Sequence, residues 1–255
     1  MENISPILLA FIATMFTWFI TTLGAAIVYF FKKINKNILD AMLSLAAGVM
    51  IAASFFSLIA PSIEMAKALG MNKIIITSVG FICGGLLLIL LDKIFSKRIS
   101  NSKKRCLMLV LSITLHNIPE GLAIGVAFGS IIYHLDGATI ASAMALAIGI
   151  GIQNFPEGIA VSMPLRREGL SRTKSFLYGG LSGIVEPIAG VLGALLVLKI
   201  RIVLPFFLAF AAGAMIYVVV SELVPESQTN KNKTLITMFS LIGFTIMMIL
   251  DVLLA

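Results

Sequence analysis

Eight long apolar runs, separated by short polar segments, follow one another along the chain. An α-helix needs about 20 such residues to cross the ~30 Å hydrocarbon core of a bilayer. Every backbone polar group in that core must be paired within the protein, so each run is expected to be helical. Only 12% of the residues are charged, about half the fraction typical of a soluble domain. We therefore expect an all-α integral membrane protein, a single transmembrane domain covering residues 1–255. The expected spans are about 6–31, 38–61, 74–95, 106–133, 138–165, 173–199, 203–224 and 234–254.

Basic residues are distributed unevenly between the two sides of this expected bundle. Fifteen of the 19 lysines and arginines follow spans 1, 3, 5 and 7, and the most basic segment is 93–105. Because cytoplasmic loops carry the excess of Lys and Arg, both termini are expected outside, in a multi-pass protein of the cell membrane. The net charge of +7 then faces the anionic inner leaflet of the bilayer rather than nucleic acid.

Two of the spans carry similar polar stretches, LHNIPEGLA at 115–123 and IQNFPEGIA at 152–160. At the α-helical rise His116 lies about 15 Å into span 4, and Gln153 about 22 Å into span 5. Glu186 lies about 20 Å into span 6. All three positions are near the middle of the membrane, so polar groups from three spans are expected at one depth.

Three carboxylates are expected at that depth, from Glu120, Glu157 and Glu186. Each costs roughly 3 kcal/mol or more in the bilayer centre unless it is paired or ligated. No lysine or arginine lies at the same depth, so protons or bound cations must stabilise these groups.

The spacing of the two polar stretches favours cations. His116 and Glu120 are four residues apart and share a helix face, and Asn117 is three residues from Glu120. One carboxylate can therefore serve two neighbouring metal ions, and Gln153, Asn154 and Glu157 repeat the arrangement.

Each of the three spans with a polar residue at mid-membrane depth also carries a proline within three residues of it. Pro119, Pro156 and Pro187 each remove a helical hydrogen bond, so spans 4 and 5, which form the expected metal site, and span 6 are expected to be kinked. The carbonyl groups expected to be freed, and able to point into a cavity, are those of Leu115, Ile152 and Gly183.

The side-chain types indicate the class of metal. Imidazole with carboxylates and amides, without thiolate, suits Zn²⁺, Fe²⁺, Mn²⁺, Co²⁺ or Cd²⁺. Ca²⁺ and Mg²⁺ prefer oxygen ligands alone, so His116 is the discriminating residue. The metal is expected as cargo rather than as a bound cofactor.

These motifs resemble those of a known family. HNIPEG on span 4 and QNFPEG on span 5 are similar to the signature of the ZIP (Zrt- and Irt-like) divalent metal transporters. SGIVEPIAGVLGALL in span 6 resembles their short bacterial, GufA-like branch. The resemblance implies a binuclear mid-membrane centre and an elevator-type motion of spans 1, 4, 5 and 6 against spans 2, 3, 7 and 8.

The resemblance also implies a ligand set. One metal would bind His116, Glu120, Gln153 and Glu157, and the second would share the two glutamates. The second metal would add three further ligands: Asn117, Asn154 and Glu186. Many family members have histidine where this chain has Gln153, which bears on the metal preference.

Four further residues are candidates for the path of the ion. Glu222 and Glu226 could collect metal at the cytoplasmic exit, or be solvated acids at a helix end. Met50 could line the exit or simply pack in the core. Asp136 could attract cations outside, or serve as a turn residue before Gly137.

The leading interpretation is a transporter that carries a transition-metal dication, zinc above all, into the cytoplasm. The alternatives are a sodium/calcium-type cation exchanger, an intramembrane zinc hydrolase, and a metal-free structural membrane protein. His116 counts against the exchanger because calcium sites avoid imidazole. The absence of an HExxH-like motif counts against the hydrolase. The sequence leaves open whether the chain forms a homodimer.

Overall fold

The structure is a computed structural model, and it describes residues 5–31, 35–96, 101–134 and 138–254. All regular elements in these ranges are helices. They are α1 (Pro6–Ala26), η1 (Ile27–Phe30), α2 (Lys36–Ala53), η2 (Ser54–Ile59), α3 (Ala60–Ala68), α4 (Lys73–Ser96), α5 (Asn101–Ile132), α6 (Ile140–Arg167), α7 (Arg172–Leu181), α8 (Val185–Leu195), α9 (Val197–Val218), η3 (Val219–Leu223), α10 (Val224–Ser227) and α11 (Lys233–Leu254).

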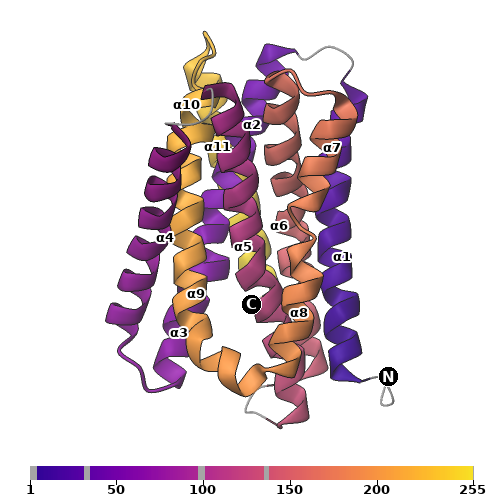
Figure 1. Ribbon diagram of the computed structural model, residues 1–255, viewed down its shortest axis with the longest axis vertical. Coiled ribbons are helices and arrows are strands. Elements are labelled where there is room, and N and C mark those ends of the chain that lie inside the picture. Colours follow the sequence, from indigo (N-terminus) through magenta and orange to yellow (C-terminus); the bar gives the residue numbers. More distant parts are fainter. Residues whose placement is uncertain (1–4, 32–34, 97–100, 135–137, 255) are drawn as a thin grey trace.

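Within the described ranges, eight helical stretches are long and apolar enough to cross a membrane, as the sequence predicts. They run alternately up and down in one bundle (Figure 1). We call the end that carries the start of α1 and the end of α11 the terminal side. The opposite end, which carries Lys36, Arg167 and Arg172, is called the basic side. Large apolar side chains such as Phe19 and Ile74 lie exposed on the outside of the bundle, where lipid would cover them.

The helices pair along their length in a pattern that surrounds α5 and α6. Helix α1 packs along α6, and α5 packs along α8. On the other flank α4 packs along α9 and α11 along α2. The site-bearing helices thus lie between neighbours that hold them on several sides.

Glycine makes one of these contacts possible. A Cβ atom on Gly158 of α6 would overlap the backbone carbonyl of Thr21 on α1. Only a residue without a side chain allows the two backbones this separation. The contact brings α1 against the polar stretch of α6.

Spans 2 and 7 are longer than the sequence predicts. Span 2 runs from Lys36 to Ala68 and span 7 from Val197 to Ser227, and each contains a π-helical segment. Span 2 passes Pro61 without a break, because the π-helical segment η2 directly precedes α3 and Ile59 keeps helical backbone angles. Span 7 includes Lys199, which the sequence places at the end of span 6, and Arg201, which it places between spans 6 and 7. Their long side chains let a helix end carry them at a membrane surface.

Span 6 is broken into two helices just before Pro187, where the sequence predicts a kink. Helix α7 ends at Leu181 and α8 begins at Val185, with a turn between them. The Gly183 carbonyl accepts the N–H of Glu186 at 3.0 Å, so the prediction that Pro187 would leave this carbonyl free is wrong. By contrast, α5 and α6 remain α-helical through Pro119 and Pro156.

Candidate metal centre

The two polar stretches meet because α5 and α6 cross the bundle side by side. The Nε2 atom of His116 lies 3.0 Å from Oε1 of Glu120 and 3.1 Å from Oε1 of Glu157. The Gln153 amide N–H donates to the same Glu120 oxygen in a very short hydrogen bond. Among the described residues, His116, Glu120 and Glu157 form a group whose ligand atoms lie within 4.8 Å of one another. All four side chains are buried.

Lone pairs without a partner are concentrated in this centre. Buried polar atoms normally find a hydrogen-bond partner, and an unpaired one costs about 1–3 kcal/mol. Five of the seven predicted ligands nevertheless carry a buried atom with no hydrogen-bond partner in the described structure. These atoms are His116 Nδ1, Asn117 Oδ1, Glu120 Oε2, Asn154 Oδ1 and Glu157 Oε2. Four of them are oxygens that can only accept, so the centre is short of positive charge or protons.

A second cluster surrounds Glu186 at the start of α8. The Asn154 amide nitrogen donates to both carboxylate oxygens of Glu186 at 3.0 Å. The Thr17 hydroxyl of α1 adds a very short hydrogen bond to Oε2 of Glu186. Three helices thus hold this buried carboxylate, which is fully excluded from solvent.

Asn117 joins the centre to the break in span 6. Its amide nitrogen donates to the Ser182 carbonyl at 3.1 Å. That carbonyl is available because the Glu186 N–H is turned to Gly183 instead. The amide oxygen of Asn117 is left without a partner, and the broken helix therefore fixes how Asn117 presents it.

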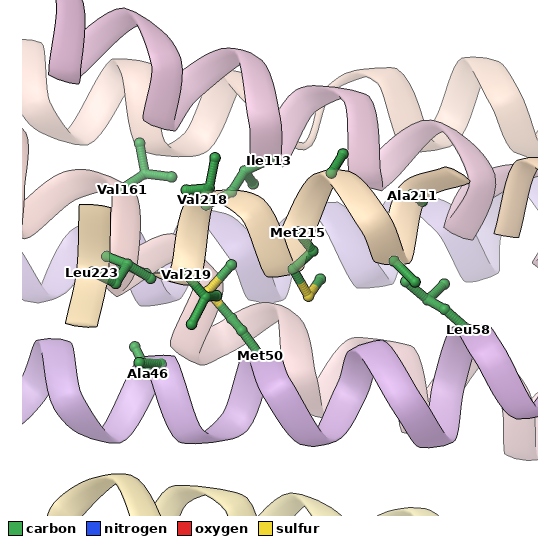
Figure 2. Packing of buried hydrophobic residues seen from close by; sticks show 14 of the residues in the cluster. Ala46, Met50, Leu58, Ile113, Val161, Ala211, Met215, Val218, Val219 and Leu223 are labelled. Carbon is green, nitrogen blue, oxygen red and sulfur yellow. The ribbon is translucent and has the colours of Figure 1, made fainter. Parts of the chain in front are cut away.

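The two sides of the centre differ in access. On the terminal side a cavity of about 180 Å³ reaches Glu120, and its other lining residues, such as Leu146 and Leu208, are mostly apolar. On the basic side lies an apolar layer built from Met50, Ile113, Val161, Val218 and Val219, all buried (Figure 2). Ile113 is one turn from His116 and Val161 one turn from Glu157, so this layer closes the centre toward the basic side.

Three of the four residues proposed for the path of the ion are described by the structure, and they lie outside the centre. Met50 belongs to the apolar layer just described. Glu226 pairs closely with Arg167 on the basic side, and Glu222 is part-buried in η3. Asp136 lies outside the described residues.

Sequence reasoning missed several polar groups that contact the centre. Thr17 is one of four threonines in the first span, and nothing in that pattern indicates that it reaches Glu186. Ser57 bonds to Gln153 Oε1 at 2.9 Å and to Asp251 Oδ1 at 2.8 Å. Asp251 did have a signal, since it is the only acid in the apolar run 234–254, but this position near the chain end gave no depth argument.

Comparisons with known proteins agree with this geometry. The sequence profile described as "ZIP Zinc transporter" matches residues 96–251, which include all seven predicted ligands. The chain belongs to the ZIP zinc transporter family. It is 37% identical to the zinc transporter ZIP11 of Homo sapiens, across 99% of both chains. It is 37% identical to the ZIP11 of Xenopus tropicalis, across 98% of both.

Bacterial ZIP proteins are also similar. The zinc transporter GufA of Myxococcus xanthus is 30% identical, across 94% of this chain and 96% of the relative. Family membership makes this chain a multi-pass membrane transporter rather than an enzyme. It decides against the hydrolase, the exchanger and the metal-free structural protein.

Proposed function

We propose that this protein carries zinc across the membrane through the buried centre between α5 and α6. The observation that carries the proposal is the group of four unpartnered oxygens on Asn117, Glu120, Asn154 and Glu157, beside the imidazole of His116. Bound dications would satisfy the unpartnered oxygens and neutralise the buried carboxylates. The relatives named above are zinc transporters, which supports zinc as the cargo.

The first ion would be held by His116, Glu120 and Glu157, whose ligand atoms already converge. Gln153 would join this set by rotating its amide, because its nitrogen now faces Glu120 and only its oxygen can bind a cation.

The second ion would take Glu186 and the amide oxygens of Asn117 and Asn154, and would share the two bridging glutamates. Both amide oxygens lack hydrogen-bond partners, which supports this part of the proposal. Glu186 would keep its bond from the Thr17 hydroxyl and exchange those from the Asn154 amide nitrogen for the ion.

Zinc would move from the terminal side to the basic side. The cavity that reaches Glu120 and the apolar layer beyond it support access from the terminal side in this conformation. The excess of basic residues at the opposite end supports a cytoplasmic basic side, and hence uptake into the cytoplasm across the cell membrane. Alternating access would shift α1, α5, α6 and α7–α8 against the other helices.

Other dications with similar ligand preferences, Cd²⁺, Fe²⁺, Mn²⁺ and Co²⁺, would compete for the same centre. The proposed pathway lies within one chain, so transport requires no homodimer.

The test is uptake of radioactive zinc by proteoliposomes containing the full chain. His116→Ala and Glu157→Gln should each lower the initial rate at least tenfold, because each removes a converging ligand. Ser162→Ala is the matched control on α6. Its buried hydroxyl has no partner within the described structure, so this variant should transport at the wild-type rate. Equal uptake by all four proteins would contradict the proposal.

Competition by other metals tests the cargo class. Excess Cd²⁺ should suppress zinc uptake strongly, and excess Ca²⁺ should leave it nearly unchanged, since His116 favours softer ions. Stronger inhibition by Ca²⁺ than by Cd²⁺ would contradict a nitrogen-containing site.

A further inference from the structure

Trp18 is the only tryptophan of the chain, and it lies in the middle of a span. It follows Pro6, the first residue of α1, by twelve residues, which is about 18 Å at the helical rise. Tryptophan is enriched at the two membrane surfaces, where its N–H meets water and headgroups. At mid-membrane depth only protein can accept this N–H. The indole N–H of Trp18 donates to the Gly180 carbonyl at 2.8 Å, so its partner is a backbone group of span 6.

The Gly180 carbonyl belongs to the break between α7 and α8. In a continuous α-helix it would accept the N–H of Ile184, four residues further on. The Ile184 N–H donates instead to the Leu181 carbonyl at 3.2 Å. The N–H of Gly183 reaches the Gly180 carbonyl, but only at 3.3 Å. The tighter turn therefore gives this carbonyl a long backbone bond, and the indole of Trp18 supplies the short one.

Two more carbonyls at the break are paired with side chains. The Gly179 carbonyl accepts the Ser182 hydroxyl at 2.7 Å. The Ser182 carbonyl accepts the Asn117 amide at 3.1 Å. Backbone polar groups within a bilayer must be paired inside the protein. Trp18 from α1 and Asn117 from α5 are thus donors from other spans that stabilise a non-helical turn at this depth.

The break also determines where Glu186 lies. This residue is in the first turn of α8, and its N–H donates to the Gly183 carbonyl at 3.0 Å. A Cβ atom on Gly183 would lie 3.0 Å from Oε1 of Glu186 and equally 3.0 Å from Cδ1 of Trp18. The carboxylate and the edge of the indole ring therefore flank the same glycine. The indole borders the turn on the side where Glu186 presents its carboxylate.

We propose that Trp18 is a positioning residue for the second ion, because its bond to the Gly180 carbonyl holds the break that presents Glu186 and Asn117. The inference rests on the proposed binding of a second ion by these two residues. The indole N–H is a donor without a lone pair, so Trp18 itself binds no cation. It acts through the shape of span 6.

Loss of the indole N–H would favour a more regular helix in span 6. The Gly180 carbonyl would then pair with the Ile184 N–H. The Ser182 carbonyl would pair with the Glu186 N–H in the same way, and Asn117 would lose its partner. The converging ligands of the first ion lie on α5 and α6, outside this break, and would stay in place.

The test removes the indole N–H alone. Position 18 is filled with 3-benzothienylalanine, which has the same two-ring shape with sulfur in place of the N–H. Zinc bound to the full chain in detergent is measured by equilibrium dialysis with radioactive zinc. The wild type should bind two ions. The replacement should weaken one of them at least tenfold, as loss of a supporting hydrogen bond commonly does, and leave the other within twofold.

Variants of the centre identify the affected ion. Glu186→Gln should weaken the same ion, so adding the replacement at position 18 to it should lower zinc affinity by no more than a further twofold. His116→Ala should weaken the other ion. Phe19→Leu is the matched control on α1, since Phe19 is exposed on the outside of the bundle, and it should bind both ions like the wild type.

Two results would overturn the role of Trp18 alone. One is wild-type affinity for both ions in the protein with the replacement. The other is equal weakening of both ions, which indicates a general loss of packing. Wild-type zinc binding that neither His116→Ala nor Glu186→Gln weakens would overturn the proposed centre and, with it, this role of Trp18.

Discussion

At the residue scale, the centre depends on groups that touch the ligands as much as on the ligands. Thr17 is the clearest case, because its hydroxyl holds Oε2 of Glu186 while Asn154 holds the same carboxylate from α6. Hydrogen bonds to charged groups contribute about 1.5–3 kcal/mol. Thr17 is therefore a positioning residue for Glu186.

Replacing Thr17 by valine should weaken the hold on Glu186 without changing the side-chain volume. Loss of such a supporting partner commonly costs 10–100-fold in metal affinity or activity. We expect Thr17→Val to raise the half-saturating zinc concentration about tenfold in the proteoliposome assay. Thr17→Ser, which keeps the hydroxyl, should restore it to within twofold. A serine variant as impaired as the valine variant would point to lost packing instead.

The predicted ligands could be identified from the sequence, whereas the polar residues that contact them could not. Sequence reasoning identified the pairs His116–Glu120 on α5 and Gln153–Glu157 on α6. In each pair the spacing along its own helix and the depth in the membrane follow from helix geometry. Thr17, Ser57 and Asp251 were not identified, since their contacts depend on which helices become neighbours. A hydroxyl in an apolar span commonly bonds to its own backbone, so its presence carries no signal.

At the element scale, the separation between α1 and α6 positions both halves of the centre. Helix α1 carries Thr17, and α6 carries Asn154 and Glu157. Gly158 lets the two backbones approach at the Thr21 carbonyl. The existence of each span was predictable from its apolar run, whereas the extra length of spans 2 and 7 and the break between α7 and α8 were not. That break depends on Asn117 of another helix, which takes up the Ser182 carbonyl.

A single methyl group at this contact should separate α1 from α6. Gly158→Ala places a Cβ atom against the Thr21 backbone, and such overpacking costs typically about 1–3 kcal/mol. We expect a lower melting temperature in detergent and zinc uptake reduced several-fold.

The matched control is Gly85→Ala on α4, where the nearest atom to the added Cβ is 3.8 Å away. This variant should melt and transport like the wild type. If Gly158→Ala behaved like Gly85→Ala in both measurements, the close contact of α1 and α6 would not be needed for the centre.

At the scale of the whole molecule, one bundle encloses a polar centre within an apolar core and presents an apolar exterior. The helical class and the number of spans were predictable, because a bilayer admits few backbone solutions. The opening toward the terminal side and the apolar layer toward the basic side were not. They depend on how residues from different spans, such as Met50, Ile113 and Val161, fill the space on the basic side of the ligands.

The central claim is that residues from distant parts of the chain assemble one buried zinc centre. The most direct measurement is an anomalous difference map from crystals of the full chain loaded with zinc, collected on both sides of the zinc absorption edge. We expect a peak about 2.0–2.2 Å from ligand atoms of His116, Glu120 and Glu157, absent from crystals of His116→Ala. Zinc peaks elsewhere, with none between α5 and α6 in a protein that still transports zinc, would contradict the assignment.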